Sequence, residues 1–132
     1  MKFSEIPGLE KEKQVLINSV KNNHIAHAQL FFGNSGGGSF ALALAYAQYI
    51  NCENKQETDS CGECPSCSKY QKLIHPDLHF IYPTVTISKG DVTTKATDVR
   101  SDILITKWRE FLIKNPFNEY LDWMTYLDVE NK

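Results

Sequence analysis

Four cysteines gathered within sixteen residues offer the clearest chemistry in this sequence: Cys52, Cys61, Cys64 and Cys67. The two short spacings, Cys61 to Cys64 and Cys64 to Cys67, place three sulfurs within reach of one point, and Cys52 can supply the fourth. Four thiolates form a closed tetrahedral shell around Zn²⁺, which leaves no position for a catalytic water. We therefore expect one structural zinc ion per chain, bound by these four residues.

The same cysteines allow other interpretations. A pair of disulfides or four free thiols would need no metal, and closely spaced cysteines also hold iron–sulfur clusters. The start of the chain lacks the apolar core of a signal peptide, which predicts a cytoplasmic protein with reduced cysteines. His75 and His79 lie nearby, but four thiolates already complete a zinc shell, and we expect His75 to have a packing or capping role.

A glycine-rich segment upstream has the spacing of a Walker A phosphate loop but lacks its two chemical residues. Gly33 and Gly38 are placed as in G-x-x-x-x-G-K-[ST], yet Ser39 replaces the lysine and Phe40 replaces the hydroxyl residue. The lysine contacts the β- and γ-phosphates and the hydroxyl binds Mg²⁺, so we expect no ATP hydrolysis and no ATP cofactor. The predicted degenerate phosphate loop consists of Gly33, Asn34, Ser35, Gly36, Gly37, Gly38, Ser39 and Phe40.

A plain flexible turn is the alternative for this glycine run, but an apolar strand before it and an alanine-rich helix after it favour the phosphate loop. The backbone N–H groups at the start of that helix can still attract an anion. Binding of this kind, without turnover, remains open at this point.

Composition limits the remaining functions. The 132 residues correspond to about one domain, and the net charge of −2 does not favour a general nucleic-acid-binding surface. No apolar run approaches the roughly 20 residues that a membrane span needs. Lys2, Lys11 and Lys13 are expected on a solvated face, while Trp108 and Trp123 are expected to pack rather than stack on bases.

Hydrophobic periodicity predicts an α/β arrangement in which helices alternate with short apolar strands. Small alanines throughout the helix after the glycine loop suit a helix pressed against a sheet. Residues 84–97 are expected to form a loop or a weak hairpin. The predicted helices cover 9–23, 39–51, 66–74, 98–114 and 117–127, and the predicted strands cover 28–32 and 77–82.

The loop and the cysteines together resemble the amino-terminal part of the delta-prime subunits of DNA polymerase III, members of the AAA+ clamp-loader family. Three ordered stretches within about residues 3–82 support the resemblance. They are Ile6-Pro7-Gly8-Leu9, then His27-Ala28-Gln29-Leu30-Phe31-Phe32-Gly33, and finally Asn51-Cys52 through Cys67 with His75-Pro76-Asp77-Leu78.

The resemblance implies a P-loop three-layer AAA+ portion with an inserted zinc module. Residues 1–51 correspond to the first half of the AAA+ domain, 52–67 to the zinc module and 68–83 to a return helix and strand. Residues 84–132 are expected to be a helical, lineage-specific insertion, because neither a Walker B strand nor sensor motifs follow the zinc module. The sequence has no further strongly apolar strand, so we also expect a part of a longer protein.

In that family, gamma and tau subunits keep the Walker lysine and hydroxyl, whereas delta-prime subunits often lose them. Ser39 and Phe40 therefore favour a non-catalytic, stator-like subunit that helps load the sliding clamp on primed DNA. The implied partners are the clamp-loader ATPase subunits, the delta subunit and the replicative polymerase holoenzyme, with primed DNA contacted indirectly and no membrane. The family's arginine finger lies in a Ser-Arg-Cys motif that is not found here, and Arg100 lacks that context.

Two other functions remain open from the sequence. One is a P-loop ATPase with an altered Walker A loop. The other is a free-standing zinc module that binds a protein or a nucleic acid.

Overall fold

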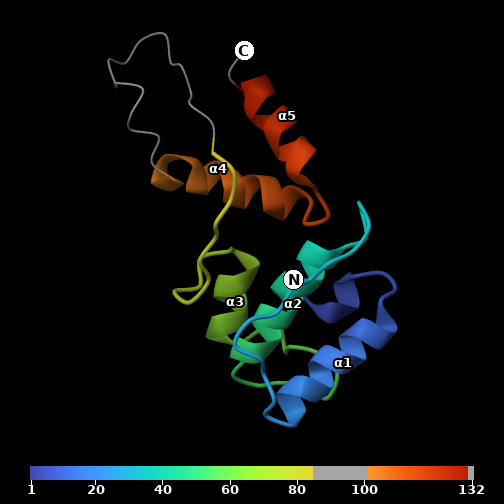
Figure 1. The fold of residues 1–132 in the computed structure, drawn as a ribbon. Helices are drawn as coiled ribbons and strands as arrows, with labels where there is room; N and C mark the ends of the chain where they lie inside the picture. The colour runs from blue at the N-terminus through green and yellow to red at the C-terminus, as the bar shows by residue number, and fades with distance from the viewer. Residues whose placement is uncertain (85–100, 131–132) are drawn as a thin grey trace. The chain divides into compact units, whose positions relative to one another are not determined.

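The computed structural model describes residues 1–84 and 101–130, and the chain divides into two compact units between Leu78 and His79. In the described ranges the chain is helical, as Figure 1 shows. The elements are the 3₁₀ helix η1 (Phe3–Glu5) and the α-helices α1 (Glu10–Lys21), α2 (Ser39–Asn51), α3 (Pro65–Gln71), α4 (Ser101–Lys114) and α5 (Tyr120–Glu130).

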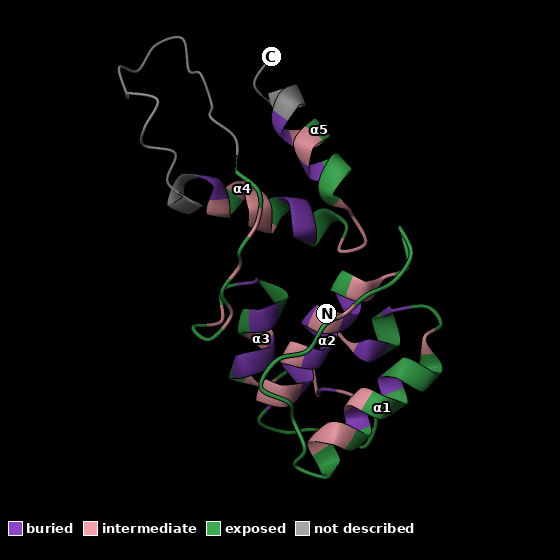
Figure 2. Cartoon of the chain, viewed as in Figure 1, coloured by how far each residue is buried: buried purple, intermediate pink, exposed green. Residues whose placement is uncertain are grey.

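Helix α2 is the centre of the first unit and contacts η1, α1 and α3 (Figure 1). It carries no charged residue, and most of its side chains are buried, including Ala41 and Ala45. A helix that is apolar on most sides must be covered on most sides, and small alanines let its neighbours approach closely. In Figure 2, α1 is exposed over much of its length, because only Lys13 and Ile17 of that helix are buried.

Two polar contacts fix the neighbours of α2. The hydroxyl oxygens of Ser19, in α1, and Tyr46, in α2, lie 2.8 Å apart and share a hydrogen bond. Asn51 Nδ2, at the end of α2, donates to the Tyr70 hydroxyl of α3 over 2.7 Å. These hydrogen bonds tie α1 to the middle of α2 and α3 to its last residue.

Lys13 corrects the prediction of a solvated lysine face. The residue is only 7% exposed, and Nζ donates to the carbonyl oxygen of Ile6 at 2.7 Å and to Glu10 Oε1 at 3.0 Å. The aliphatic stem covers apolar neighbours while the ammonium group binds the chain that enters α1. The charge of Lys13 predicted a solvated side chain. Its backbone carbonyl partner could not be predicted from the sequence, because every residue type carries such a group.

The second unit has an aromatic core supplied by α4, α5 and the segment 79–84. Trp123 is fully buried, and its Nε1 donates to the carbonyl oxygen of Pro83 over 2.9 Å. The rings of Tyr82 and Trp108 stack with centroids 4.7 Å apart and planes inclined by 4°. Both tryptophans therefore act as packing residues, as the sequence predicted.

The predicted α/β three-layer fold is wrong: the described residues contain no strand and no sheet. A strand is stabilised by hydrogen bonds to a neighbouring strand. In the described chain, the backbone of residues 28–32 has no main-chain hydrogen-bond partner, and the side chains of Leu30 and Phe32 are 90% and 91% exposed. The segment is apolar as the sequence shows, but the described residues offer no second strand with which it could pair.

Residues 77–82 also form no strand, although their alternating pattern does predict which side chains pack together and are half-buried. Phe80 and Tyr82 both lie against Trp108, whereas Ile81 points outward and is fully exposed. The partner of this segment is a pair of helices rather than a sheet.

All five predicted helices are confirmed: the helix predicted over 39–51 has the bounds of α2, and the others differ from the prediction at one or both ends. The loop or hairpin predicted over 84–97 lies outside the described residues beyond position 84, as do the first residues of the helix predicted over 98–114. No helix in the described part of the chain is long and apolar enough to cross a membrane.

Replacing Lys13 with methionine should destabilise the first unit. Methionine keeps much of the stem but leaves the carbonyl group of Ile6, a residue only 2% exposed, without its donor. We expect a loss of about 1–3 kcal/mol in the free energy of unfolding. Hydrogen exchange at the buried amides of α2 measures this loss in the first unit.

Lys11→Met is the matched control, because Lys11 lies in the same helix and is exposed. Tryptophan fluorescence serves as an internal reference, since both tryptophans lie in the second unit. Equal α2 exchange in the two variants would contradict the role assigned to Lys13.

Candidate metal centre and phosphate-loop pocket

The structure brings all four predicted cysteines together at the end of α2 and the start of α3. Their Sγ atoms all lie within 4.8 Å of one another, and none of the four residues forms a disulfide. Cys52 follows α2 directly, and Cys64 is the amino-terminal cap of α3. Cys52 and Cys67 are buried, whereas Cys61 and Cys64 are half-buried.

The sulfur spacing suits a tetrahedral metal. Bonds of about 2.3 Å from Zn²⁺ to four sulfurs place those sulfurs about 3.8 Å apart. The Sγ atoms of Cys52 and Cys61 are 3.5 Å apart, and those of Cys61 and Cys67 are 3.9 Å apart. The cluster therefore has the donor type, number and separation that a closed metal site requires.

Backbone N–H groups point at these sulfurs and favour their thiolate form. Cys61 Sγ accepts from the N–H groups of Glu63 and Cys64, at 3.5 and 3.4 Å, and Cys64 Sγ accepts from the N–H group of Cys67 at 3.4 Å. Cys52 Sγ accepts from the N–H group of Cys61 at 3.3 Å. The tight turns between the cysteines supply this set of donors.

The four thiols divide into two classes by pKa. Burial raises the pKa of Cys67 to about 12 and also raises that of Cys52. Burial acts in the same direction on Cys64, but the N–H group of Cys67 and further hydrogen bonds outweigh it and lower the pKa to about 6. The N–H groups of Glu63 and Cys64 lower the pKa of Cys61. The hydrogen bonds thus favour the thiolate form of Cys61 and Cys64, whereas burial favours the neutral thiol of Cys52 and Cys67.

His75 lies beside this centre without joining it. Its ring stacks on Tyr70 with centroids 4.4 Å apart, and Nε2 shares a hydrogen bond of 3.1 Å with Ser66 Oγ. Its Nδ1 accepts from the N–H group of Asp77 over 3.2 Å. Of the packing or capping role predicted for His75, the packing role is confirmed.

The predicted phosphate loop forms a turn that leads into α2. The N–H group of Gly37 donates to the carbonyl oxygen of Asn34 over 2.9 Å, and Gly38, with φ of 74°, precedes the helix. A Cβ on residue 37 would lie 2.7 Å from that Asn34 oxygen, so the turn requires glycine there. Ser39 and Phe40 are the first two residues of α2, where neither provides a cation or a metal-binding hydroxyl at the lysine and hydroxyl positions.

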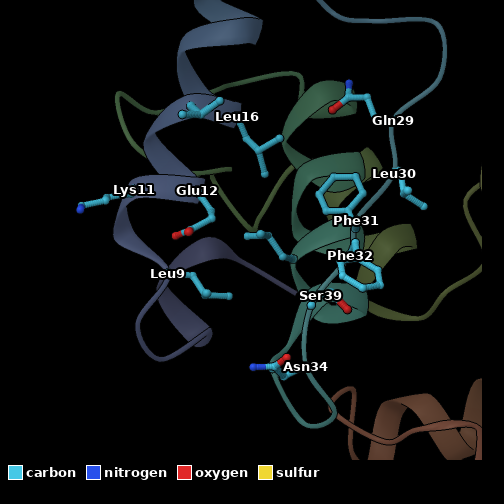
Figure 3. A pocket seen from close by; sticks show the side chains of 14 residues that line it. Leu9, Lys11, Glu12, Leu16, Gln29, Leu30, Phe31, Phe32, Asn34 and Ser39 are labelled. Carbon is cyan, nitrogen blue, oxygen red and sulfur yellow. The ribbon is translucent and has the colours of Figure 1, made fainter.

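Part of this loop borders a pocket of about 600 Å³, shown in Figure 3. Gly33, Asn34, Gly37 and Ser39 line it, whereas Ser35, Gly36, Gly38 and Phe40 do not. The other lining residues come from the start of α1, from the segment before the loop and from α2: Leu9, Lys11, Glu12, Val15, Leu16, Gln29, Leu30, Phe31, Phe32 and Leu42.

The pocket is a poor match for a triphosphate. Lys11 and Glu12 are its only charged lining residues, so their charges cancel, and the remaining wall is mainly apolar. Sequence reasoning missed the contribution of α1 to this wall. The spacing of Leu9 and Leu16, seven residues apart on one face of the predicted helix, could have indicated that this face borders an apolar pocket.

Two polar residues near the cysteines were also missed. Asp59 accepts backbone N–H groups from Phe3 and Ser4, and Gln48, buried in α2, donates to Ser60 Oγ over 2.8 Å. Nothing in the local sequence marks either residue, because their partners lie far away along the chain.

Metal binding at neutral pH should release about two to three protons per chain. Cys52 and Cys67 are protonated at pH 7 because their pKa values are raised, whereas Cys64, with a pKa of about 6, is already mostly ionised. Four ordinary thiols would release nearly four protons. Calorimetric titration with Zn²⁺ in buffers of different ionisation enthalpy counts these protons.

The pH dependence supplies the control. Below pH 6 Cys64 binds its own proton, so the release should increase by about one proton and the affinity should decline more steeply. Release of four protons at pH 7 would contradict the preformed N–H donor set, and an absence of Zn²⁺ binding would contradict the metal site itself.

Comparison with known proteins places the chain in a family. The family model described as DNA polymerase III, delta subunit, matches residues 8–118. The DNA polymerase III subunit delta′ of Escherichia coli K12 is 33% identical over 94 residues, which are 71% of this chain and 27% of that protein. The subunit delta′ of Bacillus subtilis 168 is 31% identical over 80 residues, which are 60% of this chain and 24% of that protein.

A third relative has a different subunit name. The DNA polymerase III subunit tau/gamma of Haemophilus influenzae is 27% identical over 111 residues, which are 84% of this chain and 16% of that protein. The chain thus spans about a sixth to a quarter of the length of these relatives. No solved structure matches it. Because the family model covers most of the sequence, the chain belongs to the DNA polymerase III delta subunit family of clamp-loader proteins.

Proposed function

We propose that this chain is part of a delta-prime-type clamp-loader subunit that supports the loader's structure without hydrolysing ATP. Its relatives include both delta′ and tau/gamma subunits, so family membership alone does not separate a structural subunit from an ATPase. The observation that carries the proposal is the start of α2, where Ser39 and Phe40 occupy the lysine and hydroxyl positions of the loop.

The electrostatics of the pocket support the same conclusion. Phosphoryl transfer depends on cations that neutralise charge developing on the phosphates. Lys11 is the only basic residue in the pocket wall, and Glu12 opposes it. The degenerate loop of residues 33–40 therefore keeps a turn and a helix start but offers little to stabilise a transferred phosphoryl group.

We further propose that Cys52, Cys61, Cys64 and Cys67 bind one Zn²⁺ ion per chain with a structural role. Four sulfurs fill a tetrahedral shell, so no coordination position remains for water or substrate. In this proposal residues 52–67 form a zinc module between 1–51 and 68–83, and residues 84–132 are a lineage-specific addition. The implied partners are the clamp-loader ATPase subunits, the delta subunit and the polymerase holoenzyme, with primed DNA reached through them.

The nucleotide chemistry is tested by restoring the two lost residues. We expect the unmodified chain to show no ATP turnover, and Ser39→Lys with Phe40→Thr to bind ATP at least about tenfold more tightly, because a lysine returns charge beside the phosphates. Calorimetric titration with ATP and Mg²⁺ measures the binding, and phosphate release measures the turnover.

Thr58→Lys is the control for added charge, since Thr58 is exposed in the cysteine loop and outside the pocket lining. Turnover by the unmodified chain that disappears in Gly37→Ala, a substitution that crowds the Asn34 carbonyl, would instead support an ATPase with an altered loop.

The assembly role is tested by affinity capture of the tagged protein, expressed from its own gene in its own cells, with mass spectrometry of what it retains. Clamp-loader ATPase subunits and polymerase components should be enriched over a tag-only control. Recovery of nucleotide kinases or unrelated factors in their place would refute the clamp-loader proposal.

A further inference from the structure

A single carboxylate connects the cysteine loop, residues 52–67, to the amino-terminal segment, residues 2–6. Asp59 Oδ1 accepts from the N–H group of Phe3 at 3.0 Å, and Oδ2 accepts from the N–H group of Ser4 at 2.9 Å. These are the first two residues of η1, and N–H groups in the first turn of a helix have no partner within it. Asp59 therefore caps η1 from 55 residues away along the chain.

The same side chain also organises its own loop. Asp59 Oδ1 accepts from the N–H group of Ser60 at 2.8 Å, and Ser60 Oγ accepts from Gln48 Nε2 at 2.8 Å. Ser60 and Gln48 are both fully buried, so α2 holds this point of the loop. The next residue is Cys61, whose sulfur accepts from two N–H groups and lies 3.5 Å from that of Cys52. A displacement of Cys61 must therefore act on Asp59, only two residues away.

The amino-terminal segment connects Asp59 to α1 through further hydrogen bonds. The N–H group of Ile6 donates to the carbonyl oxygen of Phe3 over 3.1 Å, and the carbonyl oxygen of Ile6 accepts from Lys13 Nζ. Phe3 and Ile6 are each only 2% exposed, and the Phe3 ring lies 5.6 Å from that of Tyr49 in α2. Leu9, at the start of α1, then forms part of the pocket wall.

We propose that metal binding by the four cysteines fixes the amino-terminal segment in place. The Asp59 carboxylate is the connection between the cysteine loop and that segment. This inference rests on the proposed metal site and assigns it a conformational effect on the chain that enters α1. The coupling is reciprocal: a segment that binds only the ordered loop must also raise the affinity of that loop for metal. Asp59 is thus a positioning residue for the metal centre, although it contacts no metal ligand through its carboxylate.

Hydrogen exchange of the whole chain tests the coupling directly, with Zn²⁺ as the metal and EDTA as the chelator. In the wild-type protein, chelation should speed exchange at the amides of Phe3 and Ser4 by about tenfold or more, a typical coupling strength. This measurement needs no variant, so it does not depend on the folding of a mutant.

Asp59→Asn tests the reverse direction. One amide oxygen can serve Phe3 and Ser60, but the amide NH₂ would then face the N–H group of Ser4. We expect faster exchange at Ser4 even with Zn²⁺ present, and an affinity for Zn²⁺ about tenfold weaker. Glu57→Gln is the matched control, because Glu57 is an exposed carboxylate of the same loop.

The outcomes separate this inference from the metal proposal. One Zn²⁺ ion bound per chain, with the same exchange rates at the amides of Phe3 and Ser4 in its presence and absence, would refute the coupling through Asp59 and leave the metal site standing. An unchanged Zn²⁺ affinity in Asp59→Asn leads to the same conclusion. If the wild-type chain binds no Zn²⁺, both proposals fail together.

Discussion

The first unit depends on the docking of a polar, cysteine-bearing loop onto one buried helix. Residues 52–67 have few apolar side chains and cannot form a core of their own. Their position is set by four converging sulfurs and by two kinds of hydrogen bond: Asp59 accepts from the amino-terminal segment, and Ser60 accepts from Gln48 of α2. A small module of this kind commonly needs a metal or a disulfide to be stable, and the reduced sulfurs here are spaced for a metal.

Helix α2 also fixes the distance between the two candidate sites. The glycine turn enters it at Ser39, and Cys52 follows its last residue. Thirteen residues at 1.5 Å each make a rod about 20 Å long. Because side chains on nearly every side of α2 are buried, the helix cannot slide or rotate without disturbing η1, α1 and α3 at once. The turn and the cysteine cluster are therefore the two ends of one rigid element.

The sequence predicted the features that depend on local spacing. Helical periodicity located all five helices, and the cysteine spacing anticipated the sulfur cluster. The sequence-based prediction failed where the structure or role of a residue depends on a partner that is distant in the sequence. The apolar residues 28–32 and 77–82 were predicted to be strands, but the first has no strand beside it and the second packs on α4 and α5. Lys13, Asp59 and Gln48 were missed for the same reason, since a carbonyl or an N–H group from another segment defines each role.

The glycine turn before α2 has a structural role that needs no phosphate. Its turn is closed by the hydrogen bond from Gly37 to Asn34, and the contact with the Asn34 oxygen excludes a Cβ at position 37. That turn leads the chain into α2 through backbone contacts, which do not involve the side chains of Ser39 or Phe40. Ser39 and Phe40 can therefore replace a lysine and a hydroxyl residue without loss of the junction. For the role proposed above, the junction is the part of the loop that matters, because it leads into the helix that the cysteine module follows.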